Sequence, residues 1–258
     1  SIMPDAQIYI QDFATHHEKA SRPRSTVHKA PKIGNPTPLG LSSFALSVFI
    51  LAFYNIGAFG IQIPNVIVGV SMFTGGVVQF AAGMWEFKVG NTFGGTGFGA
   101  FGGFWASFGA IYIPLFVSLL AFNMFGFAIA GIQDAFGVKT DLAGNFVAIN
   151  STVGDAVEQF HHSLAIYCLG WLIFTFIFTL ACIRTNMAVL GAFVFLTASF
   201  LFEVIYHFNP STTIFIKIAG VLGILCSSCV YYCLAGVLLT PDLSPISLPL
   251  WDLSKKDN

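Results

Sequence analysis

Two short polar loops next to apolar stretches hold the residue types most suited to binding a small solute. The first loop, residues 35–41, reads Asn-Pro-Thr-Pro-Leu-Gly-Leu, and the second, residues 90–94, reads Gly-Asn-Thr-Phe-Gly. Each places Asn, Thr and Gly at the mouth of a predicted apolar helix, where free backbone N–H groups and the positive end of the helix dipole can bind an anion. The two loops therefore predict a membrane transporter for a small anion.

The composition indicates that most of the chain lies in a membrane. Hydrophobic residues make up 55% of the 258 residues and charged residues 9%, with a mean hydropathy of +0.78. A soluble domain carries about 25% charged residues. The formal net charge is -1 and no basic cluster alternates with aromatic residues, so nucleic acid is not an expected partner. The lipid bilayer is the expected surrounding.

The cysteines give no sign of redox or metal chemistry. All of them fall within apolar stretches, where a thiol behaves as a small hydrophobic group. They are Cys168, Cys182, Cys226, Cys229 and Cys233. The Cys-x-x-Cys spacing at 226–229 lies inside a predicted helix with no second pair elsewhere, which favours packing over a zinc or redox site. We expect no cofactor and no metal.

Runs of about 20 apolar residues predict an all-α membrane protein, a bundle of six transmembrane helices. The runs lie near residues 41–61, 66–85, 101–130, 163–183, 187–206 and 212–239. Two sets of three spans would have opposite orientations, as in a 3+3 inverted repeat, although the halves show no convincing sequence identity. We expect a disordered or surface-lying cytosolic tail over 1–33, a six-helix transport domain over 34–240, and a cytosolic C-terminal tail over 241–258.

The distribution of Lys and Arg predicts that both termini face the cytoplasm. On a six-span path one side holds Lys19, Arg22, Arg24, Lys29, Lys32, Lys88, Arg184, Lys255 and Lys256, and the other holds Lys139 and Lys217. Residues 131–162 would then form an outer, acidic connection. It carries the acceptor sequence Asn-Ser-Thr at 150–152, which makes Asn150 a candidate glycosylation site. A short amphipathic helix is a further expectation for this connection.

Residues at helical spacing form stripes that could line a path through the bilayer. The stripes are Phe44, Val48, Leu51 and Asn55; Phe101, Trp105, Phe108 and Tyr112; and Leu196, Phe200, Glu203 and His207. Ordinary helix packing produces the same spacing, so the pattern alone leaves both interpretations open. Asn55, Gln79, Glu86 and Glu203 lie within or at the ends of spans, and ionisable groups there usually face protein or water because exposure to lipid costs at least about 2.5 kcal/mol. Glu86 could instead reach toward the headgroups.

The two loops together also carry a family resemblance. Residues 35–41 with Phe44, residues 86–96, which read Glu-Phe-Lys-Val-Gly-Asn-Thr-Phe-Gly-Gly-Thr, and the pair Phe104-Trp105 resemble the acetate uptake transporter family. This family includes the bacterial succinate-acetate permease and fungal acetate permeases, some of which are called ammonia transport outward proteins. The resemblance covers residues 33–239 and includes the order and number of spans.

The resemblance implies a six-helix protomer in a homo-hexamer, with a path for acetate and similar monocarboxylates in each protomer. It also implies a hydrophobic constriction, which by position along the spans falls on Phe44, Phe101 and Leu196. The chain has Phe101 where Tyr is usual and Thr37 where Ala is usual, so the third helix lacks a hydroxyl that could bond a passing carboxylate. The long tail and the extended outer connection resemble fungal members, which implies a eukaryotic plasma membrane.

A path for acetate should offer neutral hydrogen-bond donors, because deep fixed positive charge would trap a dehydrated anion. The candidate donors are Asn35, Asn55, Gln79, Asn91, Thr92 and Thr96. If transport is coupled to protons, the titrating group would be Glu86, Glu203 or His207, and their spacing does not single out one. The alternatives are a neutral-solute channel for ammonia or urea and a non-transporting acid sensor. An enzyme is not expected, because no nucleophile, base and orienting group converge.

Overall fold

The described part of the chain consists almost entirely of helices. The computed structural model describes residues 33–61, 65–112, 138–140, 146–148 and 153–254. The chain divides into two units, 1–34 and 35–258, and the description below concerns the second. Its helices are α2 (Thr37–Asn55), η1 (Ala58–Gly60), α3 (Val66–Gly69), η2 (Val70–Val78), α4 (Gln79–Lys88), α5 (Thr92–Ile111), α8 (Val153–Ala181), α9 (Met187–Phe208) and α10 (Ile214–Leu238).

Five helical runs among the described residues are long and apolar enough to cross a membrane. They are Thr37–Asn55, Val66–Lys88, Glu158–Ala181, Met187–Phe208 and Ile214–Leu238. α5 is not one of them, because glycines dilute the apolar character of its 20 residues. The all-α class is therefore confirmed, whereas the six spans and the inverted repeat stay predictions. The third predicted span begins earlier than expected, at Thr92, and its residues 113–130 lie outside the described residues.

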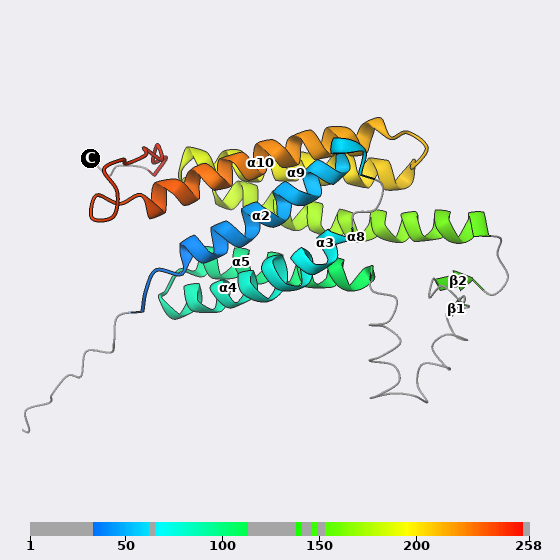
Figure 1. Cartoon of the computed structure of the whole chain (residues 1–258), viewed down its shortest axis with the longest axis horizontal. Coiled ribbons are helices and arrows are strands. Elements are labelled where there is room, and N and C mark those ends of the chain that lie inside the picture. The colour runs from blue at the N-terminus through cyan, green and yellow to red at the C-terminus, as the bar shows by residue number, and fades with distance from the viewer. Residues whose placement is uncertain (1–32, 62–64, 113–137, 141–145, 149–152, 255–258) are drawn as a thin grey trace, which may run out of the picture. The chain divides into compact units, whose positions relative to one another are not determined.

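The helices of this unit run side by side and back and forth along one direction (Figure 1). α10 packs against α2 and α9, α8 packs against α9, and α5 packs against α4 and η2. As a result, the start of α2, the turn between α4 and α5, the loop between α8 and α9, and the end of α10 meet at one end of the bundle. Residues from all four segments line one cavity there.

Local sequence explains where the helices at this end begin. α2 follows Pro36 and has Pro38 in its first turn, where a missing backbone N–H leaves no helix bond unmade. α5 follows Asn91, whose Oδ1 accepts a hydrogen bond from Gly94 N at 3.0 Å. α9 begins in the same way after Asn186, whose Oδ1 accepts from Val189 N at 3.0 Å. Asparagine therefore caps both helices at the end that holds the cavity.

The second helical run contains wide turns in its middle. Residues Val70–Val78 form the π-helix η2 between α3 and α4, a conformation that is rare and frequently found at functional sites. Gly75 is buried in this segment, and a Cβ built there would lie 2.6 Å from Cγ of Trp105 on α5 and 2.7 Å from Oγ of Ser47 on α2. The missing side chain at Gly75 therefore permits three helices to approach closely.

The connection between α5 and α8 contains a short hairpin. Its strands are β1 (Val138–Thr140) and β2 (Phe146–Ala148), which pair antiparallel with Lys139 opposite Val147. These six residues are extended, as their β-branched and aromatic residues favour, and the expectation of a short amphipathic helix elsewhere in the connection stays a prediction. Residues from Val153 onward already belong to α8. The glycosylation candidate Asn150 lies outside the described residues.

Candidate solute path

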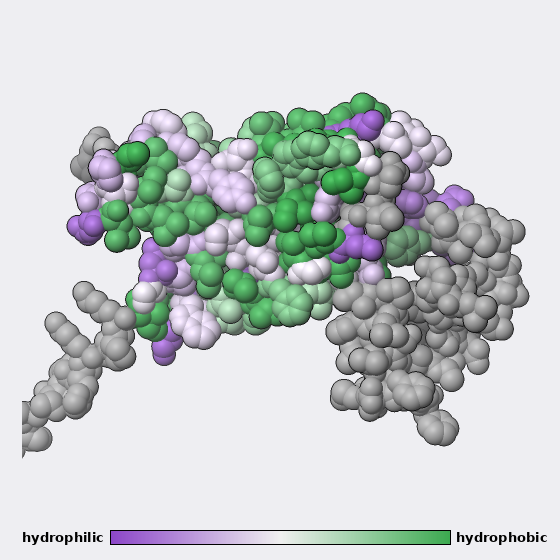
Figure 2. Space-filling model, in the orientation of Figure 1, coloured by the Kyte–Doolittle hydropathy of each residue, from purple (hydrophilic) through white to green (hydrophobic). Residues whose placement is uncertain are grey.

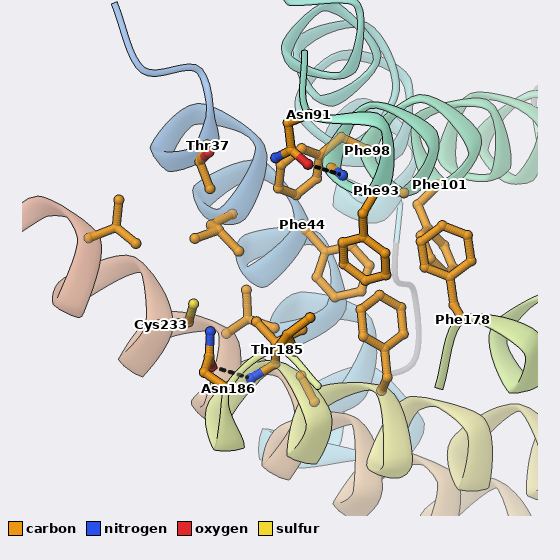
Figure 3. Close-up of a pocket in the computed structure, with 18 of the residues that line it drawn as sticks. Thr37, Phe44, Asn91, Phe93, Phe98, Phe101, Phe178, Thr185, Asn186 and Cys233 are labelled. Carbon is orange, nitrogen blue, oxygen red and sulfur yellow. Dashed lines mark hydrogen bonds between the residues drawn. The ribbon is translucent and has the colours of Figure 1, made fainter. Parts of the chain in front are cut away.

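A cavity of about 390 Å³ occupies the end of the bundle where the four connections meet (Figure 3). Most of its wall is aromatic or aliphatic, and the aromatic residues are Phe44, Phe93, Phe98, Phe101, Phe178 and Phe193. Four polar uncharged residues border it: Thr37, Asn91, Thr185 and Asn186. An apolar cavity with a few convergent polar groups is the usual form of a small-molecule site.

The three residues expected at a constriction lie together in this wall. Phe44 of α2 and Phe101 of α5 are in edge-to-face contact, with ring centroids 5.4 Å apart, and both rings lie beside the cavity in Figure 3. Leu196 of α9 also borders the cavity. All three side chains are buried, at 7%, 2% and 7% exposure. The structure thus brings together residues from three helices that are far apart in the sequence.

A second, smaller cavity of about 30 Å³ begins on the other side of Leu196. Leu196 lines both cavities, and Val48 and Trp105, one turn beyond Phe44 and Phe101, line only the smaller one. A volume of this size holds about two or three waters, since one water needs roughly 10–15 Å³. Leu196 is thus shared by the two cavities, and Phe44 and Phe101 line the large cavity one turn from Val48 and Trp105, which line the small one.

Two of the predicted polar residues border the smaller cavity. Asn55 Nδ2 donates a hydrogen bond of 3.4 Å to Glu203 Oε1, which links α2 to α9. Ser199 lies one turn before Glu203 and donates to the Ala219 carbonyl at 2.9 Å. The long Asn55 bond leaves most of the acceptor capacity of the Glu203 carboxylate unused in this contact. Glu203 carries the only carboxylate among the residues that line the two cavities.

His207 lies one turn beyond Glu203 and contacts a residue that the sequence did not single out. Its Nδ1 lies 3.0 Å from Nδ1 of His161 on α8, so one of the two rings must carry a proton on that nitrogen. No spacing rule could pair these histidines, because they come from different helices. Among the residues that the structure describes, no group of three or more His, Cys, Asp or Glu could hold a metal ion.

Glu86 connects the two polar loops. Its side chain is 1% exposed and points into the protein, away from the headgroup position considered above. Oε1 accepts a hydrogen bond from Thr37 Oγ1 at 2.5 Å, and Oε2 accepts one from Asn91 Nδ2 at 2.7 Å. The Asn91 backbone N–H also donates to the Glu86 carbonyl at 2.9 Å. One carboxylate therefore holds the first turn of α2 against the turn before α5.

The remaining predicted donors do not converge on the cavities. Asn35 Oδ1 accepts from Thr37 N at 3.0 Å, and Thr92 is exposed at the first position of α5. Asn35, Thr92 and Thr96 are not among the residues that line either cavity. Gln79 is fully buried and does not line them either, and its amide atoms have no hydrogen-bond partner among the described residues. The structure therefore brings only Asn91 and Asn55 of this set to the cavities.

Several lining residues were not predicted from the sequence. Thr185 and Asn186 come from the loop between α8 and α9, and Val237 and Leu250 come from the end of α10 and the chain after it. Asn186 had a usable signal, since it precedes an apolar run just as Asn91 does. Leu250 had none, because its position depends on how the chain folds back after α10.

Apolar helices around two cavities that share a buried apolar side chain define a membrane protein with a candidate path for small solutes. Residues 18–255 match the GPR1/FUN34/yaaH family, and the chain belongs to that family. Its members include transporters and channels. The family match confirms the resemblance that the two polar loops indicated.

Relatives and a solved structure show how closely the chain follows this family. It is 39% identical over 201 residues to ammonia transport outward protein 2 of Saccharomyces cerevisiae, which covers 78% of this chain and 60% of the relative. It is 33% identical over 216 residues to acetate permease A of Emericella nidulans, covering 81% and 63%. The structure of the bacterial acetate channel SatP superposes with a TM-score of 0.63 at 26% identity and covers 85% of this chain and 99% of that one. The chain thus spans about three fifths of the length of these two fungal relatives.

Proposed function

We propose that this protein moves acetate and related small monocarboxylates across a membrane, along the line of the two cavities. The observation that carries the proposal is the pair of cavities that share Leu196, with Phe44 and Phe101 in the wall of the larger one. The names of two similar proteins, acetate permease A and the acetate channel SatP, support acetate as the solute. The protein acts in this proposal as a transporter or channel and not as an enzyme.

The wall of the large cavity suits an anion with one apolar end. The methyl group of acetate would lie against the phenylalanine rings, and the carboxylate would lie near Asn186, because Thr37 and Asn91 already donate to the Glu86 carboxylate. Asn186 stands at the start of α9, where a helix N-terminus favours negative charge. No lysine or arginine lines either cavity, so the anion would meet no fixed positive charge that could trap it.

The apolar boundary between the cavities would act as the size filter. Water leaves a narrow apolar segment easily, so a solute crossing it must give up its hydration. A small, singly charged acid loses less hydration free energy at this segment than a larger or doubly charged acid. In this proposal Phe44, Phe101 and Leu196 form the constriction, and a change in their volume changes which acids pass.

For proton coupling we propose Glu203, together with His207, in preference to Glu86. Both oxygens of Glu86 accept short hydrogen bonds from Thr37 and Asn91, which hold the carboxyl group in a fixed position away from a passing solute. Glu203 borders the small cavity and has one long bond, to Asn55. An ionised Glu203 would repel a passing acetate, and this repulsion grows as the site loses water. Glu203 would therefore take up a proton during passage.

We further propose that the protein is a homo-hexamer in the plasma membrane with both termini in the cytoplasm. The start of α2 and the end of α10 border the same cavity, which supports termini on one side, and the Lys and Arg distribution supports the cytoplasmic side. Large apolar side chains such as Phe73, Val77 and Ile166 are 70%, 61% and 67% exposed. Apolar residues take up much of the face of the helices that Figure 2 draws, where they would contact lipid or neighbouring protomers.

Uptake of labelled acetate into liposomes that contain the purified protein tests the proposal. Uptake above protein-free liposomes is expected, and an inward proton gradient should increase it if transport is coupled. The second candidate solute is ammonia, which the name of ammonia transport outward protein 2 favours. A protein that passes methylamine or ammonia but no labelled acetate, at any pH gradient, would replace the acetate proposal with the neutral-solute one.

A further inference from the structure

The chain after α10, residues 240–254, folds back to the end of the bundle that holds the large cavity. We call these residues the C-terminal segment. Tyr232 Oη on α10 donates to the Pro249 carbonyl at 2.7 Å. Met187 N donates to the Trp251 carbonyl at 3.1 Å, and Leu253 N donates to the Thr185 carbonyl at 2.9 Å. The segment is therefore bonded both to α10 and to the loop between α8 and α9.

Backbone and ring contacts hold residues 250 and 251 in place. The Trp251 ring stacks on the Tyr232 ring, with centroids 5.8 Å apart and planes 9° from parallel. Trp251 has a φ of 48°, a left-handed conformation that is rare for a bulky residue and persists only where the surroundings impose it. Trp251 stays 59% exposed, while the preceding residue, Leu250, lines the cavity.

Leu250 is packed closely against Gly236 of α10. A Cβ built on Gly236 would lie 2.6 Å from Cδ2 and 3.0 Å from Cγ of Leu250. Val237, the next residue of α10, lines the cavity with Leu250. The leucine side chain thus fills the space over Gly236 and completes the wall between α10 and the loop that carries Thr185.

We propose that Leu250 is a size-determining residue of the solute cavity, so that the C-terminal segment helps to set which carboxylates this cavity accepts. The inference rests on the proposed function for the nature of the solute. It concerns a different place from the constriction, because Leu250 lies at the end of the cavity bordered by Asn186 and Val237. A shorter residue 250 leaves volume for a longer acid, and a larger residue removes volume.

The test compares uptake of labelled butyrate and acetate by liposomes that contain the protein or its variants. Leu250→Ala should raise the ratio of butyrate to acetate uptake by about 10-fold, since a hydrophobic pocket discriminates roughly 10-fold or more for a methylene group. Leu250→Phe should lower the ratio below that of the wild type. The matched control is Leu243→Ala in the same segment, which alters a leucine that is 80% exposed and does not line the cavity.

The two opposite substitutions keep the inference testable if one variant does not fold. An unchanged ratio in a folded Leu250→Ala or Leu250→Phe protein that still takes up acetate would overturn the inference and leave the proposed function standing. A wild-type protein that takes up neither acid would overturn the proposed function instead. Binding would then decide the role of Leu250. Butyrate should raise the melting temperature of purified Leu250→Ala more than that of Leu243→Ala, and an equal rise in both proteins would overturn the inference.

Discussion

The Glu86 carboxylate gives the sharpest prediction, because it joins both polar loops through two hydrogen bonds. Thr37 Oγ1 and Asn91 Nδ2 donate to its two oxygens at 2.5 and 2.7 Å. In Glu86→Gln the amide can still accept from Asn91 and donate to the Thr37 hydroxyl, which accepts as well as donates. In Glu86→Ala both partners lose their acceptor inside the protein. The two variants therefore separate the charge from the link itself.

The expected losses of stability follow from these bonds. A hydrogen bond to a charged group contributes about 1.5–3 kcal/mol. Thr37 is half-buried and Asn91 is exposed, so water can bond to both after the substitution, and Glu86→Ala should cost about 3 kcal/mol, the lower end for two such bonds. Glu86→Gln exchanges charge-assisted bonds for neutral ones, which are about half as strong, and should cost about 1–2 kcal/mol. Thr37→Val removes one donor while keeping the shape and should cost about 1–2 kcal/mol. Thr92→Val, at an exposed threonine beside Asn91, is the matched control and should change stability little.

Thermal unfolding of the purified variants in detergent, followed by uptake in liposomes, measures this prediction. The melting temperature should be highest for Thr92→Val, lower for Thr37→Val and Glu86→Gln, and lowest for Glu86→Ala. The double variant Thr37→Val with Glu86→Ala should lose less stability than the sum of the two single variants, since both substitutions remove the same hydrogen bond. A Glu86→Ala protein as stable as Thr92→Val would refute the link. Glu86→Gln should keep the pH dependence of acetate uptake, and a flat profile would return proton coupling to Glu86.

Three further predictions concern the path and its orientation. Leu196→Ala should widen the boundary between the cavities and raise uptake of lactate or succinate relative to acetate by about 3- to 10-fold; unchanged ratios would argue against a filter there. Glu203→Gln should flatten the pH dependence of acetate uptake while leaving some flux, and a wild-type pH profile would exclude Glu203. A cysteine at Ser151 should react with an impermeant thiol reagent added outside intact cells, whereas labelling only after permeabilisation would invert the proposed orientation.

The helices could be predicted well because a membrane requires long apolar runs with all backbone groups bonded internally. Their starts were predicted less well. α2 begins at Thr37 rather than near residue 41, because proline is tolerated in a first helical turn. α5 begins at Thr92 rather than at Phe101, because the Asn91 cap starts a helix through a glycine-rich stretch that an apolar count passes over.

The candidate site could be predicted only where one helix face or one motif carries the information. Helical spacing and the family resemblance pointed to Phe44, Phe101 and Leu196, which the structure places in one wall. Contacts between distant segments left no such signal. Glu86 bonds to Thr37, 49 positions earlier in the chain, whereas its place near the end of a predicted span allowed a headgroup contact. Leu250 reaches the cavity only because its segment folds back.

Leu196→Trp tests the central claim, that solute passes between Phe44, Phe101 and Leu196, most directly. The larger ring would fill the boundary between the cavities, where Leu196 is 7% exposed, whereas Leu201→Trp alters the same helix at a leucine that is 45% exposed. Both proteins would be purified, matched for thermal stability and compared for uptake of labelled acetate in liposomes. The proposal predicts uptake at the protein-free background for Leu196→Trp and near the wild type for Leu201→Trp. Equal, undiminished uptake by both variants would contradict it.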